Sequence, residues 1–393
     1  MTQPDAIGTS QRTLFLTFRA ALGGTTVTYL FNLFVLPFVL HRLGASLFGA
    51  WATVSTVLAI GGLADAGVRT EIIRRVADAH GARDPDALRR AVHQGVALLA
   101  ALSGAVFVTG ALAAPLLRSF AFPRGVRGYA DADLETLIRV TLAILAVSLV
   151  ANGYFAALRG VQRGDVESTA IATAVPAAAA ATVLGVLAGW GLWALVVGSA
   201  TQLAVQFLFQ AIAARRLLPE LRFGVGGLGN RAWQAYLGLS GLAFVSQISE
   251  VVDAQWDKLI ISRYVGSAAV TSFQVGTSLV IQAKVLVVLP LAPMLVAIAE
   301  LRHQDPDRLD ALCRRLSRTS FVLGGAVFGA IFVFAPAFIR LWLGSEYTTA
   351  GDVARLFAVA GLCNLVSAPL GFRAFGEGLH GLAAIGSLVN IGI

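Results

Sequence analysis

The polar residues of this sequence that could do chemistry lie inside long apolar runs. Lys284, one of only two lysines, lies within the apolar run 267–295. Gln274 and Thr277 fall with it in an arc of about 80° if each residue turns by about 100°, as in an α-helix. A buried ammonium on such a face could hold an anion as a compact point charge. The alternatives are a structural ion pair, or a side chain that extends to the polar boundary of the run.

A second set of polar residues lies in the run 238–262. Gln247, Glu250, Asp253 and Asp257 fall within an arc of about 120° on a helix. Glu250 lies near the middle of the run, whereas Asp257 lies near its end. Acidic groups there could carry protons or sodium, or pair with basic side chains. For Asp257 we favour a solvated position at the end of the run, or a role in a gate.

Three further charged residues lie close to the ends of apolar runs. Arg19 is one turn into the run 15–40. Its side chain could extend back to the boundary of the run, the simpler interpretation, or it could contact a substrate phosphate. Asp65 and Arg69 lie at the end of the run 48–67, where they could form a gate or a cluster that sets topology.

The elements that must position these residues are membrane-spanning helices. Only 13% of the 393 residues are charged and 57% are hydrophobic, whereas soluble domains carry about 25% charged residues. Runs of roughly 20 apolar residues fit helices rather than barrel strands. The sequence therefore predicts an all-α integral membrane protein with ten full spans and an eleventh that begins near residue 380. The predicted full spans are 15–40, 48–67, 94–117, 136–158, 167–189, 191–213, 238–262, 267–295, 319–341 and 353–372.

The distribution of arginine predicts the orientation of these spans. Twenty arginines lie in segments on the side of the N-terminus, and nine arginines or lysines lie on the other side. Cytoplasmic loops carry an excess of Lys and Arg, so we expect a cytoplasmic N-terminus. Because the arginines are scattered in loops between spans, they indicate topology and not a nucleic-acid patch.

The sequence repeats itself at an offset of about 221 residues. Asp84-Pro85-Asp86 matches Asp305-Pro306-Asp307, Gly104-Ala105-Val106-Phe107 matches Gly325-Ala326-Val327-Phe328, and Pro115 matches Pro336. Six spans separate the copies, so both cross the membrane in the same direction, as in parallel-repeat transporters. We expect an N-terminal bundle over 1–213, a cytoplasmic linker over 214–236 and a C-terminal bundle over 237–393, with a central cavity between the bundles. A duplicated scaffold without transport activity is the alternative.

The second copy of the repeat is shorter than the first. The first copy continues from Gly164 to Ala213 and holds two spans there, whereas only 12 residues follow Gly381. The comparison predicts that a twelfth span is missing, and therefore a truncated chain.

Enzyme chemistry has little support in the sequence. The five histidines lie outside the interiors of the predicted spans, and neither an H-E-x-x-H pattern nor a G-x-x-x-x-G-K-[ST] pattern occurs. We expect no catalytic residues, metal or cofactor. Two cysteines cannot build a disulfide framework.

Four short motifs, in chain order, resemble those of the polysaccharide flippase family, the Wzx-like branch of the superfamily that also contains multidrug and toxin (MATE) extruders. They are Arg42-Leu43-Gly44 with Phe48-Gly49-Ala50-Trp51; Asp65-Ala66-Gly67-Val68; Asp253 with Asp257-Lys258-Leu259-Ile260 and Gly266; and Leu341-Trp342-Leu343-Gly344 with Tyr347. The resemblance implies a MATE-like fold in the bacterial inner membrane. It also implies export of an oligosaccharide linked to a polyprenyl diphosphate, with a polysaccharide polymerase and glycosyltransferases as partners.

Three functions are consistent with these observations. The first is a flippase for lipid-linked oligosaccharides, whose diphosphate Lys284 would bind. The second is a cation-coupled multidrug extruder, which Glu250 permits. The third is a membrane scaffold without transport activity, or an inactive truncated transporter.

Overall fold

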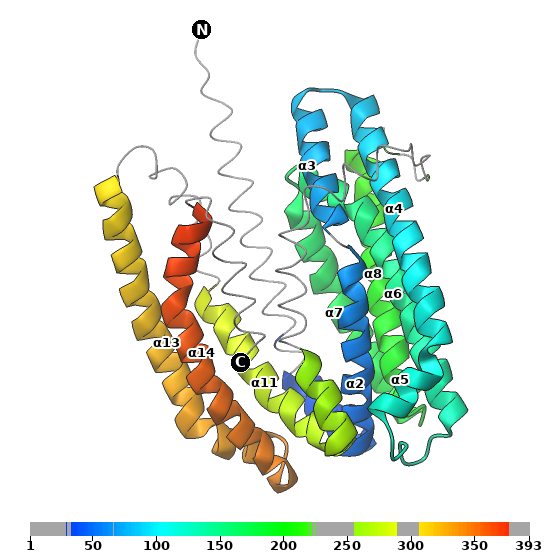
Figure 1. Ribbon diagram of the computed structural model, residues 1–393, viewed down its shortest axis with the longest axis vertical. Coiled ribbons are helices and arrows are strands. Elements are labelled where there is room, and N and C mark those ends of the chain that lie inside the picture. The colour runs from blue at the N-terminus through cyan, green and yellow to red at the C-terminus, as the bar shows by residue number, and fades with distance from the viewer. Residues whose placement is uncertain are drawn as a thin grey trace. The chain divides into compact units, whose positions relative to one another are not determined.

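The computed structural model describes residues 33–65, 67–219, 255–288 and 306–376, together with residues 29, 221 and 224 (Figure 1). The chain forms two compact units. The first comprises Met1–Leu47 and Val54–Phe244, and the second comprises Phe48–Thr53 and Val245–Ile393. The predicted linker over 214–236 stays a prediction, because most of it lies outside the described residues.

Long helices build the first unit, and α4, α6 and α8 run side by side in it (Figure 1). Its core lies where α3, α4 and α6 meet, around the buried side chains of Ile72, Val96 and Leu158. The described elements are a helix over Leu33–Leu43, α2 (Ala45–Gly61), the short 3-10 helix η1 (Gly62–Asp65), α3 (Val68–Gly81), α4 (Pro85–Leu112), α5 (Ala114–Ala121), α6 (Asp131–Gly160), α7 (Gly164–Leu187) and α8 (Leu192–Leu217). Within α2, Phe48–Thr53 belongs to the second unit.

The second unit contains α11 (Ser267–Val288), α13 (Pro306–Trp342), η3 (Ser345–Tyr347) and α14 (Thr348–Gly376). Residues 255–264 form a further helix. Helix α14 packs along both α13 and α11 (Figure 1). A Cβ atom at Gly276 of α11 would lie 2.6 Å from the carbonyl oxygen of Ala350. Glycine therefore allows α11 and α14 to approach closely, as small residues do between helices in membranes.

The all-α membrane architecture expected from the sequence is confirmed in the described part of the chain. Five helices there are long and apolar enough to span a membrane: Pro85–Leu112, Asp131–Gly160, Gly164–Leu187, Leu192–Leu217 and Arg314–Trp342. Each overlaps a span predicted from the sequence. Leu33–Leu43 and α2 form a bent pair with an angle of 119° at Gly44, whose φ is 81°. Spans predicted over 15–28, 238–254 and beyond 380 lie outside the described residues, so the count of eleven stays a prediction.

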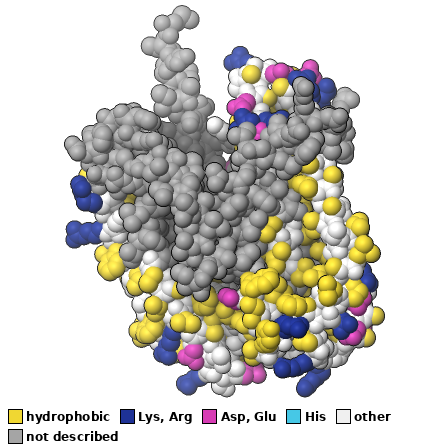
Figure 2. Space-filling view, in the orientation of Figure 1, with side chains coloured by type: hydrophobic (Ala, Val, Ile, Leu, Met, Phe, Trp, Pro, Cys, Tyr) yellow, Lys and Arg dark blue, Asp and Glu magenta, His cyan; other side chains and the backbone are white. Residues whose placement is uncertain are grey.

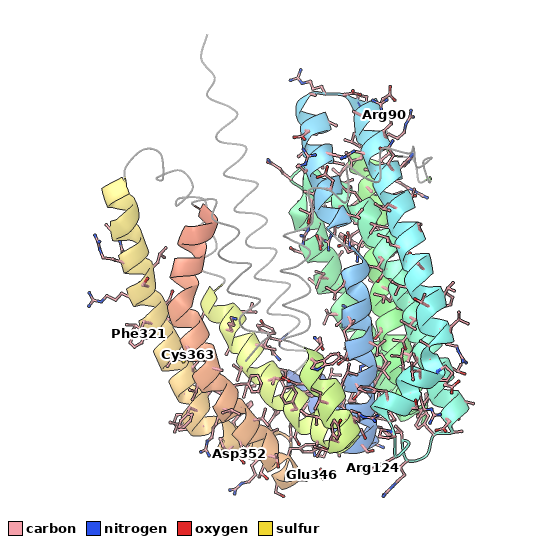
Figure 3. All side chains as sticks on the ribbon, viewed as in Figure 1. Arg90, Arg124, Phe321, Glu346, Asp352 and Cys363 are labelled. Carbon is pink, nitrogen blue, oxygen red and sulfur yellow. The ribbon has the colours of Figure 1, made fainter. Side chains whose placement is uncertain are left out.

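Apolar and charged side chains are separated along the first unit. Hydrophobic side chains cover the length of its helices, and Lys, Arg, Asp and Glu gather toward its ends (Figure 2). Arg90, in the first turns of α4, and Arg124, after α5, lie at opposite ends of this unit (Figure 3). A helix that spans a bilayer needs this separation, because a charged side chain near the bilayer centre is costly.

A proline and an arginine form the same arrangement in each unit. Proline lacks an N–H group, so it leaves the carbonyl four residues earlier without its helical partner. Pro336 frees the Phe332 carbonyl in this way, and Arg355 Nε of α14 donates a hydrogen bond to that oxygen at 2.9 Å. The guanidinium also lies 6.0 Å from the centre of the Phe332 ring.

The first unit repeats this arrangement around Pro115, which the internal repeat pairs with Pro336. Pro115 frees the carbonyl of Ala111, and Arg139 Nε of α6 donates to that oxygen at 3.3 Å. Each arginine also pairs with an acid one turn earlier in its own helix. Arg139 lies 3.1 Å from Glu135, and Arg355 lies 3.7 Å from Asp352. In each of the duplicated bundles, therefore, an arginine of another helix donates a hydrogen bond to the carbonyl that proline leaves free.

Replacing Arg355 should leave the Phe332 carbonyl without a donor. We expect Arg355→Met to destabilise the protein by about 1.5 kcal/mol, the lower end of the range for a hydrogen bond that involves a charged group, because Arg355 is partly exposed. Pro336→Ala should suppress most of that loss, because alanine restores the backbone donor to the same oxygen. The measurement is thermal unfolding of the purified protein in detergent, for both single variants and the double variant.

Arg340→Met is the matched control, because Arg340 lies in the last turn of α13 and its side chain has no hydrogen bond or ion pair with a residue that the structure describes. It should shift the unfolding temperature little. If Arg355→Met lowers the unfolding temperature equally in the native and the Pro336→Ala backgrounds, Arg355 stabilises the bundle through other contacts.

Candidate functional site

The face of α11 predicted from the sequence carries Gln274, Thr277 and Lys284. Lys284 is partly exposed and forms no ion pair or hydrogen bond with any residue that the structure describes. The Oε1 atom of Gln274 is buried and has no donor among those residues. The two side chains start about 15 Å apart along the helix axis, since each residue adds about 1.5 Å. Two polar groups of α11 thus have no partner among the described residues, and that they bind substrate stays a prediction.

Thr277 differs from these two residues. It is buried, and its hydroxyl donates to the carbonyl of Phe273, at 2.8 Å, in its own helix. Its neighbour Gly276 lies against α14, where Phe273 and Phe357 also meet edge to face, with ring centres 5.5 Å apart. Contacts with α14 thus fix the rotation of α11. That Thr277 binds substrate stays a prediction.

The acidic candidates are only partly described. Asp257 is exposed on the helix over 255–264, beside the buried Lys258, whose Nζ donates to Gln255 Oε1 at 2.8 Å. Glu250, Asp253 and Arg19 lie outside the described residues. Their roles stay predictions.

The gate candidates Asp65 and Arg69 lie together at the start of α3. Gly67 has a φ of 77°, a left-handed conformation that lets the chain turn from η1 into α3. This turn brings Asp65 Oδ1 to the backbone N–H of Arg69, which donates to it at 2.9 Å. The carboxylate therefore satisfies one of the free N–H groups at the helix start.

Arg69 extends from this turn to a carboxylate that the sequence analysis did not identify. Its Nη2 donates to Glu167 of α7 at 3.0 Å, and Arg159 of α6 bonds the other oxygen of Glu167. Arg69 Nε is buried without a partner among the described residues. One acid thus joins the starts of α3 and α7 and the end of α6. The sequence analysis placed Glu167 at the start of the predicted span 167–189 and counted Arg159 among the loop arginines, and no spacing rule connected either residue to Arg69.

Further ion pairs lie along α3, around Glu71. Glu71 is buried and accepts hydrogen bonds from Arg74, at 2.8 and 2.6 Å, and from Arg75 at 2.7 Å. The Arg74 guanidinium, and next to it that of Arg75, lower the pKa of Glu71 despite the opposing effect of burial. Its carboxylate therefore remains ionised.

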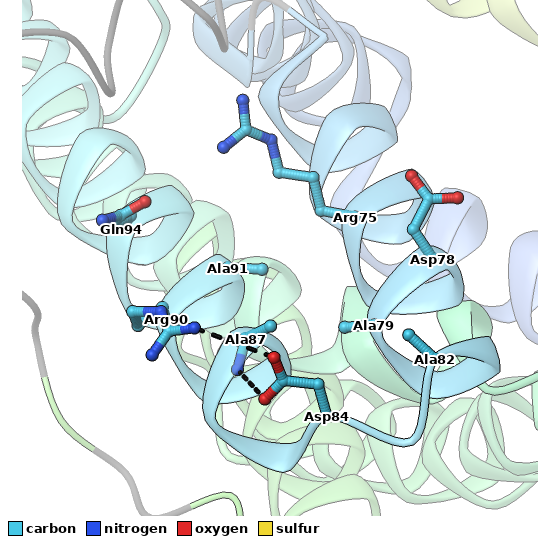
Figure 4. A pocket seen from close by; sticks show the side chains of 9 residues that line it. All are labelled: Arg75, Asp78, Ala79, Ala82, Asp84, Ala87, Arg90, Ala91 and Gln94. Carbon is cyan, nitrogen blue, oxygen red and sulfur yellow. Dashed lines mark hydrogen bonds and ion pairs between the residues drawn. The ribbon is translucent and has the colours of Figure 1, made fainter.

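A pocket of about 410 Å³ lies between the end of α3 and the start of α4 (Figure 4). Asp84 caps α4 by accepting from the backbone N–H of Ala87 at 2.8 Å, and it lies 3.9 Å from Arg90. The charges around this pocket are largely balanced within the protein. In the described part of the chain, no group of three or more His, Cys, Asp or Glu residues could hold a metal ion.

Comparison with known proteins identifies the family. The model of the family described as "Polysaccharide biosynthesis protein" matches residues 39–352. This chain belongs to that family. The resemblance inferred from the sequence motifs is thereby confirmed. A search of curated proteins gave no significant match.

Solved structures show the fold of this polysaccharide biosynthesis protein. It is similar to an inward-facing multidrug resistance MATE family transporter of the MOP superfamily, with a TM-score of 0.69 and 16% identity over 94% of this chain and 88% of that chain. An outward-facing transporter of the same description gives 0.64 and 18% over 96% and 83%. A MOP superfamily transporter from Pyrococcus furiosus, described by a binding pocket of reverse polarity, gives 0.64 and 18% over 96% and 84%. The fold is therefore MATE-like.

The contact between Arg69 and Glu167 in this family member should be energetically coupled. Both side chains are less than a third exposed, at 27% and 20%. We expect Arg69→Met and Glu167→Met to be non-additive in thermal unfolding by about 1 kcal/mol, because Glu167→Met already removes the carboxylate that pairs with Arg69. The exposed pair Arg89 and Asp86 is the control and should couple by less than about 0.5 kcal/mol. Additive effects at Arg69 and Glu167 would contradict the contact.

Glu71 should make the protein sensitive to acid. Because its folded pKa lies below the usual 4.5, ionised Glu71 stabilises the folded state above about pH 4.5. That contribution is lost as the pH falls through the lowered pKa. Glu71→Gln should lower the unfolding temperature at pH 7 and flatten its fall between about pH 4.5 and pH 3. Asp78→Asn, at the exposed end of the same network, should change the profile little. An unchanged acid profile in Glu71→Gln would contradict this assignment.

Proposed function

We propose that this protein moves a polyprenyl-diphosphate-linked oligosaccharide across the bacterial inner membrane for the synthesis of a surface polysaccharide. The observation that supports the proposal most directly is the face of α11, where Lys284 has no partner among the described residues and Gln274 Oε1 is buried without a donor. Membership of the polysaccharide biosynthesis family and the MATE-like fold support the same function.

The chemistry of this face suits the polar part of such a lipid. A diphosphate carries negative charge, which an ammonium can meet as a point charge from several directions. An amide can donate to a sugar hydroxyl through its nitrogen and accept through its oxygen. A separation of about 15 Å along α11 would let Lys284 bind the diphosphate while Gln274 contacts the sugars. In this mechanism no covalent bond changes.

The energy for transport must come from outside this sequence, which has no nucleotide-binding P-loop pattern. An ion gradient, or consumption of the exported oligosaccharide by a polymerase, could make the reaction directional. Glycosyltransferases would supply the substrate on the cytoplasmic side. We also propose the cytoplasmic N-terminus predicted from the arginine distribution, which places the turn between α3 and α4 on the cytoplasmic side.

A cation-coupled multidrug extruder is the alternative that the fold permits. Cationic drugs bind best to acidic and aromatic groups, and an unpaired lysine would repel them. The positive charge at Lys284 therefore favours an anionic substrate.

Replacing Lys284 tests the proposal. In cells that lack their own flippase, Lys284→Ala should abolish surface polysaccharide while the protein still accumulates in the membrane. Lys284→Arg should retain part of the activity, because the charge remains but the geometry differs. The measurements are the amount of surface polysaccharide and the amount of lipid-linked precursor that remains inside.

Gln282→Ala is the control on the same helix, because residue 282 lies about 160° from Lys284 around the helix axis at about 100° per residue. It should leave export close to normal. Normal polysaccharide in Lys284→Ala cells would reduce this lysine to a structural role and remove the main support for the function.

A further inference from the structure

A pocket of about 450 Å³ lies between the start of α7 and the end of α8 in the first unit. Its lining includes the apolar side chains of Val166, Phe209, Ile212 and Ala213, of which Val166 is buried. Two arginines line it as well, Arg163 before α7 and Arg216 in the last turn of α8, together with the polar side chains of Asp165 and Thr169. The pocket therefore combines charged and polar side chains with apolar side chains from both helices.

The two arginines have different partners. Arg163 donates two hydrogen bonds to Asp165, at 3.0 and 3.1 Å, so its charge is balanced next to it. Arg216 is exposed and forms no hydrogen bond or ion pair with any residue that the structure describes. Among the described residues, the pocket thus carries one positive charge without a counter-charge. A negatively charged group from outside the described residues would compensate it.

The position of the pocket along the helices limits the source of that ligand. Gly164–Leu187 and Leu192–Leu217 are both apolar enough to span a membrane, and the two arginines lie where one begins and the other ends. They are therefore at the level where a bilayer changes from acyl chains to head groups. Large apolar side chains of α8 next to the pocket, Leu208 and Ile212, are 61% and 45% exposed, as expected for a surface that lipid covers.

We propose that this pocket binds an anionic membrane phospholipid, with its phosphate at Arg216 and Arg163 and the upper part of an acyl chain along Phe209, Ile212 and Ala213. Basic pockets between membrane helices on the cytoplasmic side bind anionic head groups in this way. One net positive charge matches one phosphodiester, whereas a diphosphate would leave excess negative charge. A zwitterionic head group would bring an ammonium to the arginines. The site is separate from the α11 face and does not depend on the proposed function.

Native mass spectrometry of the purified full chain can test this site with phosphatidylglycerol and phosphatidylethanolamine of identical acyl chains. The native protein should prefer phosphatidylglycerol. Arg216→Gln should weaken phosphatidylglycerol binding about fivefold, since one surface arginine contributes about 1 kcal/mol to the attraction of an anionic lipid. The affinity for phosphatidylethanolamine should change little. Arg215→Gln is the matched control, because it removes the same charge from the same turn at a residue that does not line the pocket.

The apolar part of the site needs a second variant. Ile212→Trp should fill this part of the pocket and weaken the binding of both phospholipids, and it also serves as the test if Arg216→Gln does not fold. Equal effects of Arg215→Gln and Arg216→Gln would reduce the site to general surface attraction. Equal binding of the two lipids to the native protein would exclude a head-group site. If polyprenyl diphosphate displaces phosphatidylglycerol and depends more strongly on Arg216, the pocket serves the transported lipid and the proposal is wrong.

Discussion

The structure depends on one constraint, that a backbone polar group in lipid must find its partner within the protein. Helices meet this requirement along their length, and proline breaks it at a single carbonyl. Arg139 and Arg355 supply the missing donors, at 3.3 and 2.9 Å, to the carbonyls of Ala111 and Phe332. An acid one turn away holds each guanidinium. In this protein, charged side chains therefore satisfy carbonyls that proline leaves free, and these arginines connect α4–α5 to α6 and α13 to α14.

The same constraint separates structural charges from charges that can bind a ligand. Glu167 joins Arg69 to Arg159, and Glu71 joins Arg74 to Arg75, so these side chains compensate one another and fix helix ends. Lys284 and Arg216 have no such compensation among the described residues, although both lie on helices of the membrane domain. Lys284 lies inside a helix, where an unpaired charge is costly in a bilayer, whereas Arg216 lies exposed at a helix end. A bound anion would compensate either charge.

Sequence patterns predicted the long apolar helices of the described part well, because the composition and length of an apolar run are enough to specify a span, but α3 lies between two predicted spans and was not predicted. The pairing of Pro115 with Pro336 was also visible, since both follow the offset of about 221 residues. Their arginines were not recognised as equivalents, because the connection before α14 is shorter than that before α6, so Arg139 and Arg355 differ by a smaller offset. Arg69 and Glu167 are 98 residues apart in the sequence. The spacing of residues within one helix cannot reveal a contact between residues so far apart. Thr277 shows another limit: helical spacing placed it beside Lys284, but its hydroxyl bonds its own helix.

The internal repeat also explains why the candidate site belongs to only one copy. The segment that begins at Gly266 matches the segment that begins at Gly44, so the position of Lys284 corresponds to about Gly62. There the first copy has ended α2 at Gly61 and changed to η1, which leads into the cluster of Asp65 and Arg69. The second copy instead continues α11 through this position to Val288 and carries an ammonium on it. The two copies therefore share the same proline–arginine contacts. They differ at the position where α2 ends in the first copy and α11 continues in the second. A substrate with a charged end and an uncharged sugar part is itself asymmetric, and a duplicated bundle can bind it in a defined direction only after its two copies have diverged in this way.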